Sequence, residues 1–223
     1  MSNFEKELLE SADTIYLPNR YLEPFVEAVG NITDIEIPAM QGRKGGAESN
    51  GQIFRWVRGR DVAKIVASVQ AAQPKKRIVG LSGSEWCDEY MLGELTGRVA
   101  ADRRIEYYNI PSAKLMGRVA IIAPPSLDAD QMRGKIQPGR EQLVPVVTVY
   151  PNLAKASKSS LSITTSLEFT LNGSVETVAD DLGMLALDLV CTGDTVIQNN
   201  FTILAELQDA FPAIVVAAGA NTF

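Results

Sequence analysis

Short apolar segments alternate with segments of helical periodicity along most of this sequence of 223 residues. Apolar runs suited to buried strands are followed by stretches in which apolar residues recur every three or four positions. Such alternation is typical of α/β proteins, in which helices cover the faces of a sheet. The length suits one large domain or two small lobes. We therefore expect an α/β fold with mostly parallel sheets.

The expected elements follow from these runs and from the Gly and Pro residues between them. Strands are expected at residues 14–17, 35–37, 53–57, 77–81, 118–123, 144–149, 167–171, 185–190 and 213–218. Helices are expected over residues 3–12, 21–29, 60–71 and 85–94, from a start at 173–176, and over residues 196–210. Residues 41–46 indicate a loop or hairpin tip, and residues 124–142 form a long polar insertion.

The chain contains no histidine, and this absence removes several kinds of chemistry. Ser-His-Asp and Cys-His catalysis are excluded, as are the usual zinc sites with histidine ligands. Any reaction must use carboxylates, Arg and Lys, hydroxyls, backbone amides or a bound hard metal. The net charge of −6 argues against a nucleic-acid-binding protein, which needs a basic face for the phosphate backbone.

Several features lead us to expect a cytoplasmic protein. The first residues lack a basic segment followed by an apolar run, so no secretion signal is expected. No apolar stretch approaches the length needed to span a membrane. The two cysteines, Cys87 and Cys191, lie far apart, and in this setting reduced thiols are expected rather than a disulfide.

The segment with the clearest chemical meaning is the loop Thr192–Thr195, which follows the apolar run Leu185–Val190. A buried strand that ends in a small, hydroxyl-rich turn before a helix presents backbone N–H groups and Thr hydroxyls to an anion. The helix N-terminus adds about half a positive charge, so a phosphate suits this position. The alternative is an ordinary helix cap, because Thr and Asp cap helices in any protein. Asp188 favours the phosphate site, because a carboxylate within an apolar strand is costly without a role.

A second strand-to-helix junction, Gly173–Glu176, places a carboxylate where it could face the same crevice as Asp188. The carboxylates of Glu176 and Asp188 could together hold sugar hydroxyls or, less directly, a magnesium ion. An acidic residue in the first turn of a helix also has a purely structural explanation, because it interacts favourably with the helix dipole.

A third junction, Gly80–Ser84, follows an expected strand. It has neither the spacing of a P-loop nor that of a dinucleotide fingerprint, so ATP hydrolysis and NAD binding do not follow from it. Four nearby cations could neutralise a pyrophosphate, although arginines on loops are more often solvated surface. These cations are Arg43, Lys44, Arg58 and Arg60.

Two of these motifs are specific in their order and spacing. Gly173–Glu176 matches the pattern Gly-Ser-x-Glu, and Asp188–Thr195 with Asn199 matches Asp-Leu-Val-x-Thr-Gly-x-Thr-Leu-x-x-Asn. Further matching segments are Arg58–Val62, Gly80–Glu89, Arg118–Pro124 and Thr148–Leu153. In chain order these segments resemble short-form ATP phosphoribosyltransferase, the first enzyme of histidine biosynthesis.

The resemblance implies two lobes resembling type II periplasmic binding proteins, with the active site in the cleft. Residues 1–112 and 213–223 would form the first lobe, and residues 113–212 the second, which would bind phosphoribosyl pyrophosphate (PRPP). Glu176 and Asp188 would lie near the ribose hydroxyls of PRPP. The residues that would cradle its 5-phosphate are Thr192, Gly193, Asp194 and Thr195.

The implied reaction transfers the phosphoribosyl group of PRPP to N1 of ATP and releases pyrophosphate, which magnesium would accompany. Arg20 and Arg43 are the candidates for stabilising the leaving pyrophosphate, and Arg58, Ser82 and Gly83 for the nucleotide side. No metal-ligating residues are assigned. Members of this length work with a regulatory subunit related to histidyl-tRNA synthetase, so a homo- or hetero-oligomer is expected.

The sequence departs from the family pattern at several positions. Asn19–Tyr21 stands where the family has Lys-Gly-Arg, Met184 stands where an Asp is expected, and Cys191 stands where an acidic residue is usual. Two alternatives follow from these departures. The chain could be a paralogue that acts on another heterocyclic base, or a non-catalytic subunit that binds phosphate or PRPP.

Overall fold

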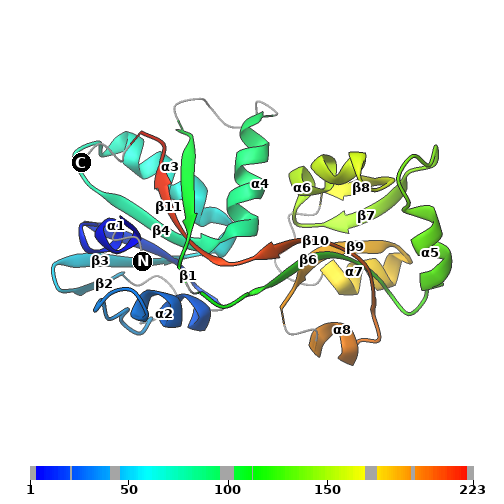
Figure 1. Cartoon of the computed structure of the whole chain (residues 1–223), viewed down its shortest axis with the longest axis horizontal. Helices are drawn as coiled ribbons and strands as arrows, with labels where there is room; N and C mark the ends of the chain where they lie inside the picture. Colours follow the sequence, from blue (N-terminus) through cyan, green and yellow to red (C-terminus); the bar gives the residue numbers. More distant parts are fainter. Residues whose placement is uncertain are drawn as a thin grey trace. The chain divides into compact units, whose positions relative to one another are not determined.

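The chain folds into two compact units, each built around its own sheet (Figure 1). The computed structural model describes residues 4–20, 22–40, 46–95, 103–111, 113–168, 175–191 and 194–219. The first unit comprises Met1–Met116 with Phe211–Phe223, and the second comprises Gly117–Ala210. The chain therefore leaves the first unit after Met116 and returns to it at Phe211.

The first unit contains a six-stranded sheet with the order β2-β3-β1-β4-β11-β5. Its strands are β1 (Thr14–Pro18), β2 (Gly46–Ser49), β3 (Gln52–Val57), β4 (Ile78–Gly83), β5 (Ile105–Asn109) and β11 (Pro212–Ala217). Its helices are α1 (Phe4–Glu10), α2 (Glu23–Gly30), α3 (Val62–Ala72) and α4 (Ser84–Leu95), with a short 3-10 helix at Gly59–Asp61.

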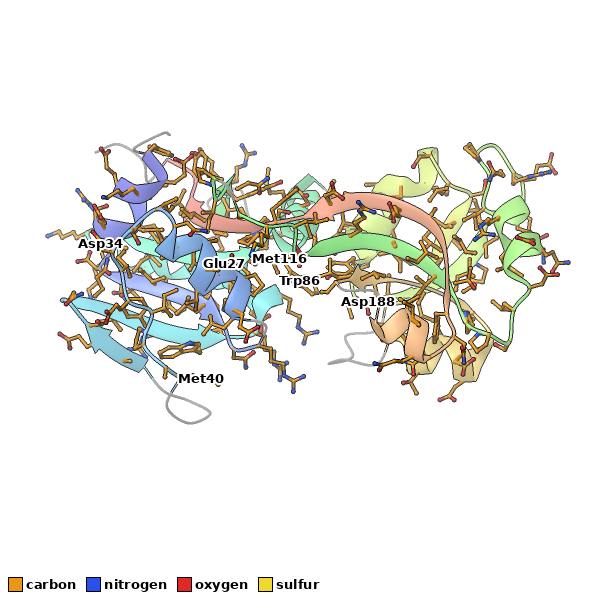
Figure 2. All side chains as sticks on the ribbon, turned by 60° about the horizontal axis from the view of Figure 1, so that its bottom comes forward. Glu27, Asp34, Met40, Trp86, Met116 and Asp188 are labelled. Atoms are coloured by element: carbon orange, nitrogen blue, oxygen red, sulfur yellow. The ribbon has the colours of Figure 1, made fainter. Side chains whose placement is uncertain are left out.

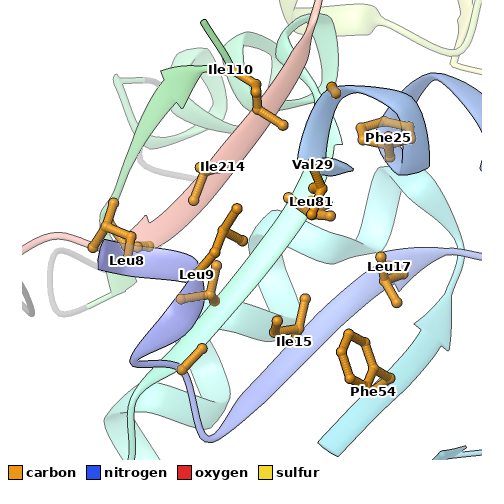
Figure 3. Packing of buried hydrophobic residues seen from close by; sticks show 14 residues of the cluster. Leu8, Leu9, Ile15, Leu17, Phe25, Val29, Phe54, Leu81, Ile110 and Ile214 are labelled. Atoms are coloured by element: carbon orange, nitrogen blue, oxygen red, sulfur yellow. The ribbon is translucent and has the colours of Figure 1, made fainter. Parts of the chain in front are cut away.

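Alternation along β1 divides the core of this unit between the two faces of the sheet. Ile15 and Leu17 pack with α1 and α2 on one face, whereas Tyr16 packs with α3 and α4 on the other. This follows from the two-residue period of a strand. Figure 3 shows the first of these clusters. Its labelled residues are Leu8, Leu9, Ile15, Leu17, Phe25, Val29, Phe54, Leu81, Ile110 and Ile214.

The second unit contains a five-stranded sheet with the order β10-β6-β9-β7-β8. Its strands are β6 (Gly117–Ala123), β7 (Val144–Thr148), β8 (Ile163–Glu168), β9 (Leu185–Val190) and β10 (Thr202–Ala210). Its helices are α5 (Ala129–Lys135), α6 (Pro151–Ala156), α7 (Val175–Leu182) and α8 (Asp194–Gln198), with a 3-10 helix at Ser157–Ser159. Buried residues of α7 and α8 pack on one face of β6, β7 and β9.

Both sheets are mixed, so the expectation of mostly parallel sheets is wrong. Among the strand pairs of the described residues, β1 pairs in parallel with β3 and β4, and β7 pairs in parallel with β8 and β9. The other pairs are antiparallel: β11 pairs with β4 and β5, β6 pairs with β9 and β10, and β2 forms a hairpin with β3. The strands in parallel pairs are β3, β1 and β4 in the first sheet and β9, β7 and β8 in the second, where β8 is the edge strand.

Two expected elements are not formed. The segment expected as a helix over residues 196–210 contains only the short α8, and Thr202–Ala210 is an edge strand paired with β6. Residues 35–37, expected as a strand, have no regular structure, although Ile35 and Ile37 pack against the first core. Thr33 fixes this segment, since its hydroxyl donates to the Val29 carbonyl and accepts the N–H of Ile35.

The structure also adds elements that the sequence patterns did not indicate. The strands β2 and β5 and the helix α5, which lies within the polar insertion, were not expected. The β8 strand begins at Ile163, four residues before the expected start at 167. No helix among the described residues is long and apolar enough to cross a membrane.

Candidate functional site

The parallel strands β8, β7 and β9 end at one edge of the second unit's sheet. Parallel strands place their carboxyl ends together, and ligands of α/β proteins bind at such edges. A helix follows each strand there: α6 begins at Pro151 after β7, α7 at Val175 after β8, and α8 at Asp194 after β9. Their N-termini therefore lie at the same edge, where the helix dipoles favour a negatively charged ligand.

The turn between β7 and α6 is fixed by buried side chains. The hydroxyl of Thr148 accepts the N–H of Tyr150 at 2.8 Å, and both side chains are buried. Pro151 then occupies the first turn of α6, where a proline costs no hydrogen bond. The Thr-x-Tyr-Pro motif is therefore explained by the local structure of this edge.

Asp188 is the charged residue of β9, two residues before the strand ends at Val190. Since successive side chains of a strand point to opposite faces, Asp188 lies on the same face as Ala186, which packs with α7. One carboxylate oxygen accepts the N–H of Leu189 at 2.8 Å. The side chain is partly exposed and is labelled in Figure 2.

The structure brings Glu176 and Asp188 close enough to interact. The pKa of Asp188 is raised from its ordinary value of 3.8 to about 7, mainly by burial and in addition by the charge of Glu176 in the first turn of α7. The hydrogen bond from Leu189 acts the other way. A carboxyl group in this state can both donate and accept hydrogen bonds at neutral pH.

Several candidate residues lie outside the described part of the chain. Arg43, Thr192 and Gly193 are among them, as are Gly173 and Ser174 of the second motif. Asp194 and Thr195 begin α8, but only their backbone is described. The assignment of these residues to a phosphate remains a prediction.

The candidate residues of the first unit fall into an exposed group and a buried group. Arg20 is exposed two residues after β1 ends, and Arg58 is exposed immediately before the 3-10 helix Gly59–Asp61. Ser82 is fully buried at the end of β4, and its hydroxyl donates to the carbonyl of Gly59 at 3.3 Å. This bond ties the end of β4 to the segment that carries Arg58.

Gly83 ends β4 beside the carboxylate of Glu85, which is 1% exposed. A Cβ at position 83 would lie closer to the Glu85 carboxylate oxygens than nonbonded atoms can approach, so a larger residue there requires the buried Glu85 side chain to move. The sequence indicated the motif but not the burial of Glu85. Its place in the first turn of α4 is favoured by the helix dipole, but that preference does not indicate burial.

The acidic residues near Cys87 change its protonation. Burial raises the pKa of the Cys87 thiol well above its usual range, and the charges of Glu85 and Asp88 raise it further. The other cysteine, Cys191, is an exposed thiol immediately after β9. Both cysteines are thiols, as expected from the sequence.

No group of three or more metal-ligating His, Cys, Asp or Glu side chains occurs among the residues that the structure describes. Glu176 and Asp188 supply two carboxylates, which is fewer than a magnesium site made by protein alone requires. They can nevertheless complete the coordination of a magnesium ion that arrives bound to phosphate oxygens.

The fold and this edge can be compared with known proteins. A family model described as HisG, ATP phosphoribosyltransferase, matches residues 58–221. The comparison with curated proteins finds no match. Among solved structures, the ATP phosphoribosyl transferase (HisG:HisZ) complex from Thermotoga maritima is 20% identical with a TM-score of 0.56, covering 92% of this chain and 87% of that chain.

A second similar structure is the regulatory domain of HypT from Salmonella typhimurium in its apo form. It is 10% identical with a TM-score of 0.43, covering 92% of this chain and 85% of that chain. The Thermotoga maritima structure shows a shared two-lobed α/β fold. The family model spans well over half of the sequence and includes both Glu176 and Asp188. The chain therefore belongs to the HisG family of ATP phosphoribosyltransferases.

Proposed function

We propose that this protein transfers the phosphoribosyl group of PRPP to N1 of ATP and releases pyrophosphate. The observation that carries the proposal is the pair of Glu176 and Asp188 at the carboxyl edge of β8, β7 and β9, where three helices begin. In a member of the HisG family, this edge has the charge pattern that a phosphorylated sugar requires. Helix N-termini attract the phosphate, and carboxylates bind the sugar hydroxyls.

The donor would bind with its 5-phosphate in the loop Thr192–Thr195 and its ribose beside the two carboxylates. The backbone at Asp194 begins α8, so N–H groups of this turn are free of helical bonding partners. The ribose hydroxyls would donate to Glu176 and Asp188. A pKa of about 7 allows Asp188 to lose its proton when a ligand that favours the carboxylate binds.

Magnesium would enter as a companion of the substrate. Its role is to neutralise the pyrophosphate charge, as metal ions do in other transfers from phosphorylated donors. Since no group of three metal-ligating side chains occurs in the described part of the chain, the pyrophosphate oxygens themselves would supply most of the coordination.

The reaction is a displacement at the anomeric carbon of ribose. The lone pair of N1 forms the new N–C bond while the C–O bond to pyrophosphate breaks, and the bonding electrons leave with the pyrophosphate. N1 of ATP carries no proton at neutral pH, so no general base is needed, which suits a chain without histidine. The protein would contribute positioning and charge stabilisation.

The first unit would supply the remaining groups. Arg20 is exposed and could stabilise the departing pyrophosphate, with Arg43 as a second candidate. Arg58 would face the nucleotide. Ser82 and Gly83 are packed within the protein, so their part would be to fix the backbone that carries Arg58 rather than to touch the nucleotide with a side chain.

A regulatory subunit is the proposed partner. The similar Thermotoga maritima structure is a complex of HisG with HisZ. We therefore propose that this chain works in a hetero-oligomer with a subunit related to histidyl-tRNA synthetase, in the cytoplasm.

The test combines binding with product analysis. The protein is titrated with PRPP and magnesium by calorimetry, and is then incubated with PRPP, magnesium and ATP, with and without the candidate regulatory subunit. Pyrophosphate and phosphoribosyl-ATP are measured. We expect saturable PRPP binding and formation of both products.

The matched variants are Asp188→Asn and Asp181→Asn. Both remove one negative charge, but Asp181 lies on the exposed side of α7. We expect Asp188→Asn to weaken PRPP binding about tenfold or more, because it removes a charged hydrogen-bond acceptor, and Asp181→Asn to leave it unchanged. Absence of PRPP binding would contradict the proposal.

The products distinguish the remaining alternatives. PRPP binding with no product from ATP, but with product from another heterocycle, would identify a paralogue. PRPP binding with no product from any acceptor, with or without the subunit, would identify a non-catalytic binding subunit. Either result would overturn the assignment of ATP as the acceptor.

A further inference from the structure

A cavity of about 520 Å³ lies at the opposite end of the second unit's strands from the candidate donor site. Its lining includes Val144 at the start of β7 and Leu185 at the start of β9, whereas the donor site lies where these strands end. The volume falls within the range of pockets that hold small molecules. Figure 1 shows α5, which forms part of its wall, beside the start of β7.

One wall of the cavity is a loop held in place by a buried serine. Ser162 is 3% exposed, and its hydroxyl donates to the carbonyl of Gln137 at 2.7 Å and accepts the N–H of Arg140 at 3.0 Å. The backbone of Ser162 adds bonds to Ile136 and Val144 on either side of the loop. The residues from 137 to 143 are thus fixed at both ends, although they belong to the polar insertion.

The opposite wall is the end of α7. Gly183 has a φ of +59°, the left-handed conformation that ends helices and that glycine adopts without strain. The N–H of Met184 donates to the carbonyl of Ala179 at 2.8 Å, which closes the helix. Met184 and Leu185 then lead into β9 along the cavity.

The lining combines apolar surface with basic groups. Leu127, Met132, Leu143, Met184 and Leu185 supply an apolar interior, since each is partly or fully buried. The charged side chains of the lining carry more positive than negative charge. They are Lys135, Arg140 and Glu141, which leave a net charge of +1 in a chain whose overall charge is −6.

The two cations are available to a ligand. In the part of the chain that the structure describes, the ammonium of Lys135 donates one hydrogen bond, to the neutral side-chain oxygen of Gln131 at 3.5 Å. The Arg140 guanidinium makes no ion pair or hydrogen bond with any residue in the described ranges, and it is exposed. A guanidinium next to an apolar pocket binds a carboxylate or similar oxyanion through two parallel hydrogen bonds.

We propose that this cavity is a second binding site, for a small organic monoanion with an apolar body. The apolar part would lie among Leu127, Met132 and Met184, and the anionic group would bind Arg140 and Lys135. The net charge of +1 in the lining suits a ligand with a single negative charge, and the cavity lies at the opposite end of the strands from the donor site. The site is therefore separate from donor binding and does not depend on the proposed reaction.

The test uses methionine methyl groups as reporters. The sequence has six methionines, of which Met132 and Met184 line the cavity, while Met40, Met91 and Met116 belong to the first unit. Protein labelled with 13C at the methionine methyls is titrated with 3-phenylpropionate, indole-3-acetate and octanoate, and with the neutral amide of each. Met→Leu variants assign the signals.

We expect saturable shifts of the Met132 and Met184 signals with at least one acid, and no shift of the first-unit signals. That acid should bind about five- to tenfold more tightly than its amide, because it gains a charge-assisted hydrogen bond. Arg140→Gln and Lys135→Gln should each reduce this preference. Lys158→Gln, which removes an exposed cation elsewhere in the unit, should leave it unchanged.

Two results would overturn the proposal. One is the absence of saturable shifts at Met132 and Met184 with every acid. The other is equal affinity for acid and amide, which would mean that Arg140 and Lys135 do not bind the ligand. The Met132 and Met184 signals of each variant before ligand is added show whether the second unit is folded, so neither result can be attributed to its unfolding.

Discussion

The junction after β4 and the junction after β9 look alike in sequence but differ in structure. Each strand leads into a helix through a glycine, a hydroxyl residue and an acid, at Gly83–Glu85 after β4 and at Thr192–Asp194 after β9. At the first junction, Ser82 and Glu85 are buried. At the second junction, β9 itself carries Asp188 two residues before its end, and this acid is partly exposed and has a pKa raised to about 7.

The two junctions differ in the hydrogen bonds that they make with other segments of the protein. Ser84 donates its N–H to the carbonyl of Phe211 at 2.9 Å and accepts the N–H of Phe211 at 3.1 Å, and Ser82 bonds to Gly59. These polar groups are used in holding the unit together. Among the described residues, Asp188 has one hydrogen bond, from the N–H of Leu189, and a like-charged neighbour in Glu176, which makes the pair a better place for a ligand.

The largest expected contrast concerns the two cysteines, one near each junction. Cys87 is buried with a raised pKa, and Cys191 is exposed. Because the thiolate is the reactive form, we expect a thiol reagent to modify Cys191 about 100-fold faster or more than Cys87 in the native protein. Time-resolved labelling of Cys87→Ser and Cys191→Ser variants measures each rate. Similar rates would contradict the difference in burial.

The next contrast concerns the packing of Gly83. Gly83→Ala places a methyl group against the buried Glu85 carboxylate, so we expect a loss of about 1–3 kcal/mol in the free energy of unfolding. The matched control is Gly134→Ala in α5, where no atom lies within contact distance of the new methyl group. This control should be neutral or slightly stabilising, because alanine favours the helix. Urea unfolding of both variants tests the difference.

A smaller effect should appear in the pH dependence of stability through Asp188. Its folded-state pKa of about 7 lies above the ordinary 3.8, so the folded protein keeps this proton after the unfolded chain has lost it. The contribution of the protonated Asp188 to the free energy of unfolding is therefore complete below about pH 4 and is lost as the pH rises through 7. Asp188→Asn should remove this loss.

At pH 8 we expect Asp188→Asn to be more stable than the wild type by about 1–2 kcal/mol. This is less than the full pKa difference would give, because the side chain is partly exposed and solvent screens it. The two proteins should converge near pH 4. Asp181→Asn serves as the control with the same change of charge. An equal gain in both variants would show that the effect comes from net charge rather than from the site.

The sequence predicted those elements that local patterns determine. The strands β1, β3, β6 and β9 were placed within one or two residues, because continuous apolar runs bounded by turn residues are a strong local signal. Residues 196–210 were misread because Leu204, Glu206 and Leu207 favour helices in isolation. Pairing of β10 with β6, a contact between distant segments, overrides that preference.

The sequence also predicted one contact of the candidate site, whose role in binding stays a prediction. A charge in the apolar strand singled out Asp188, and the two strand-to-helix junctions predicted that Glu176 could face the same crevice. The burial of Ser82 and Glu85 was not predictable from the sequence, because it depends on Phe211 and Gly59 reaching the same junction. The helix α5 could have been recognised, since Asp128 caps it by accepting the N–H groups of Asp130 and Gln131.

The most direct test of the donor site is protection of Cys191 by PRPP. Cys191 follows β9 and precedes the loop proposed to hold the 5-phosphate. At about ten times the Kd of PRPP with magnesium, labelling of Cys191 should slow about tenfold, because only the unoccupied protein reacts. An unchanged Cys191 rate, at PRPP concentrations that saturate binding, would show that the donor lies elsewhere.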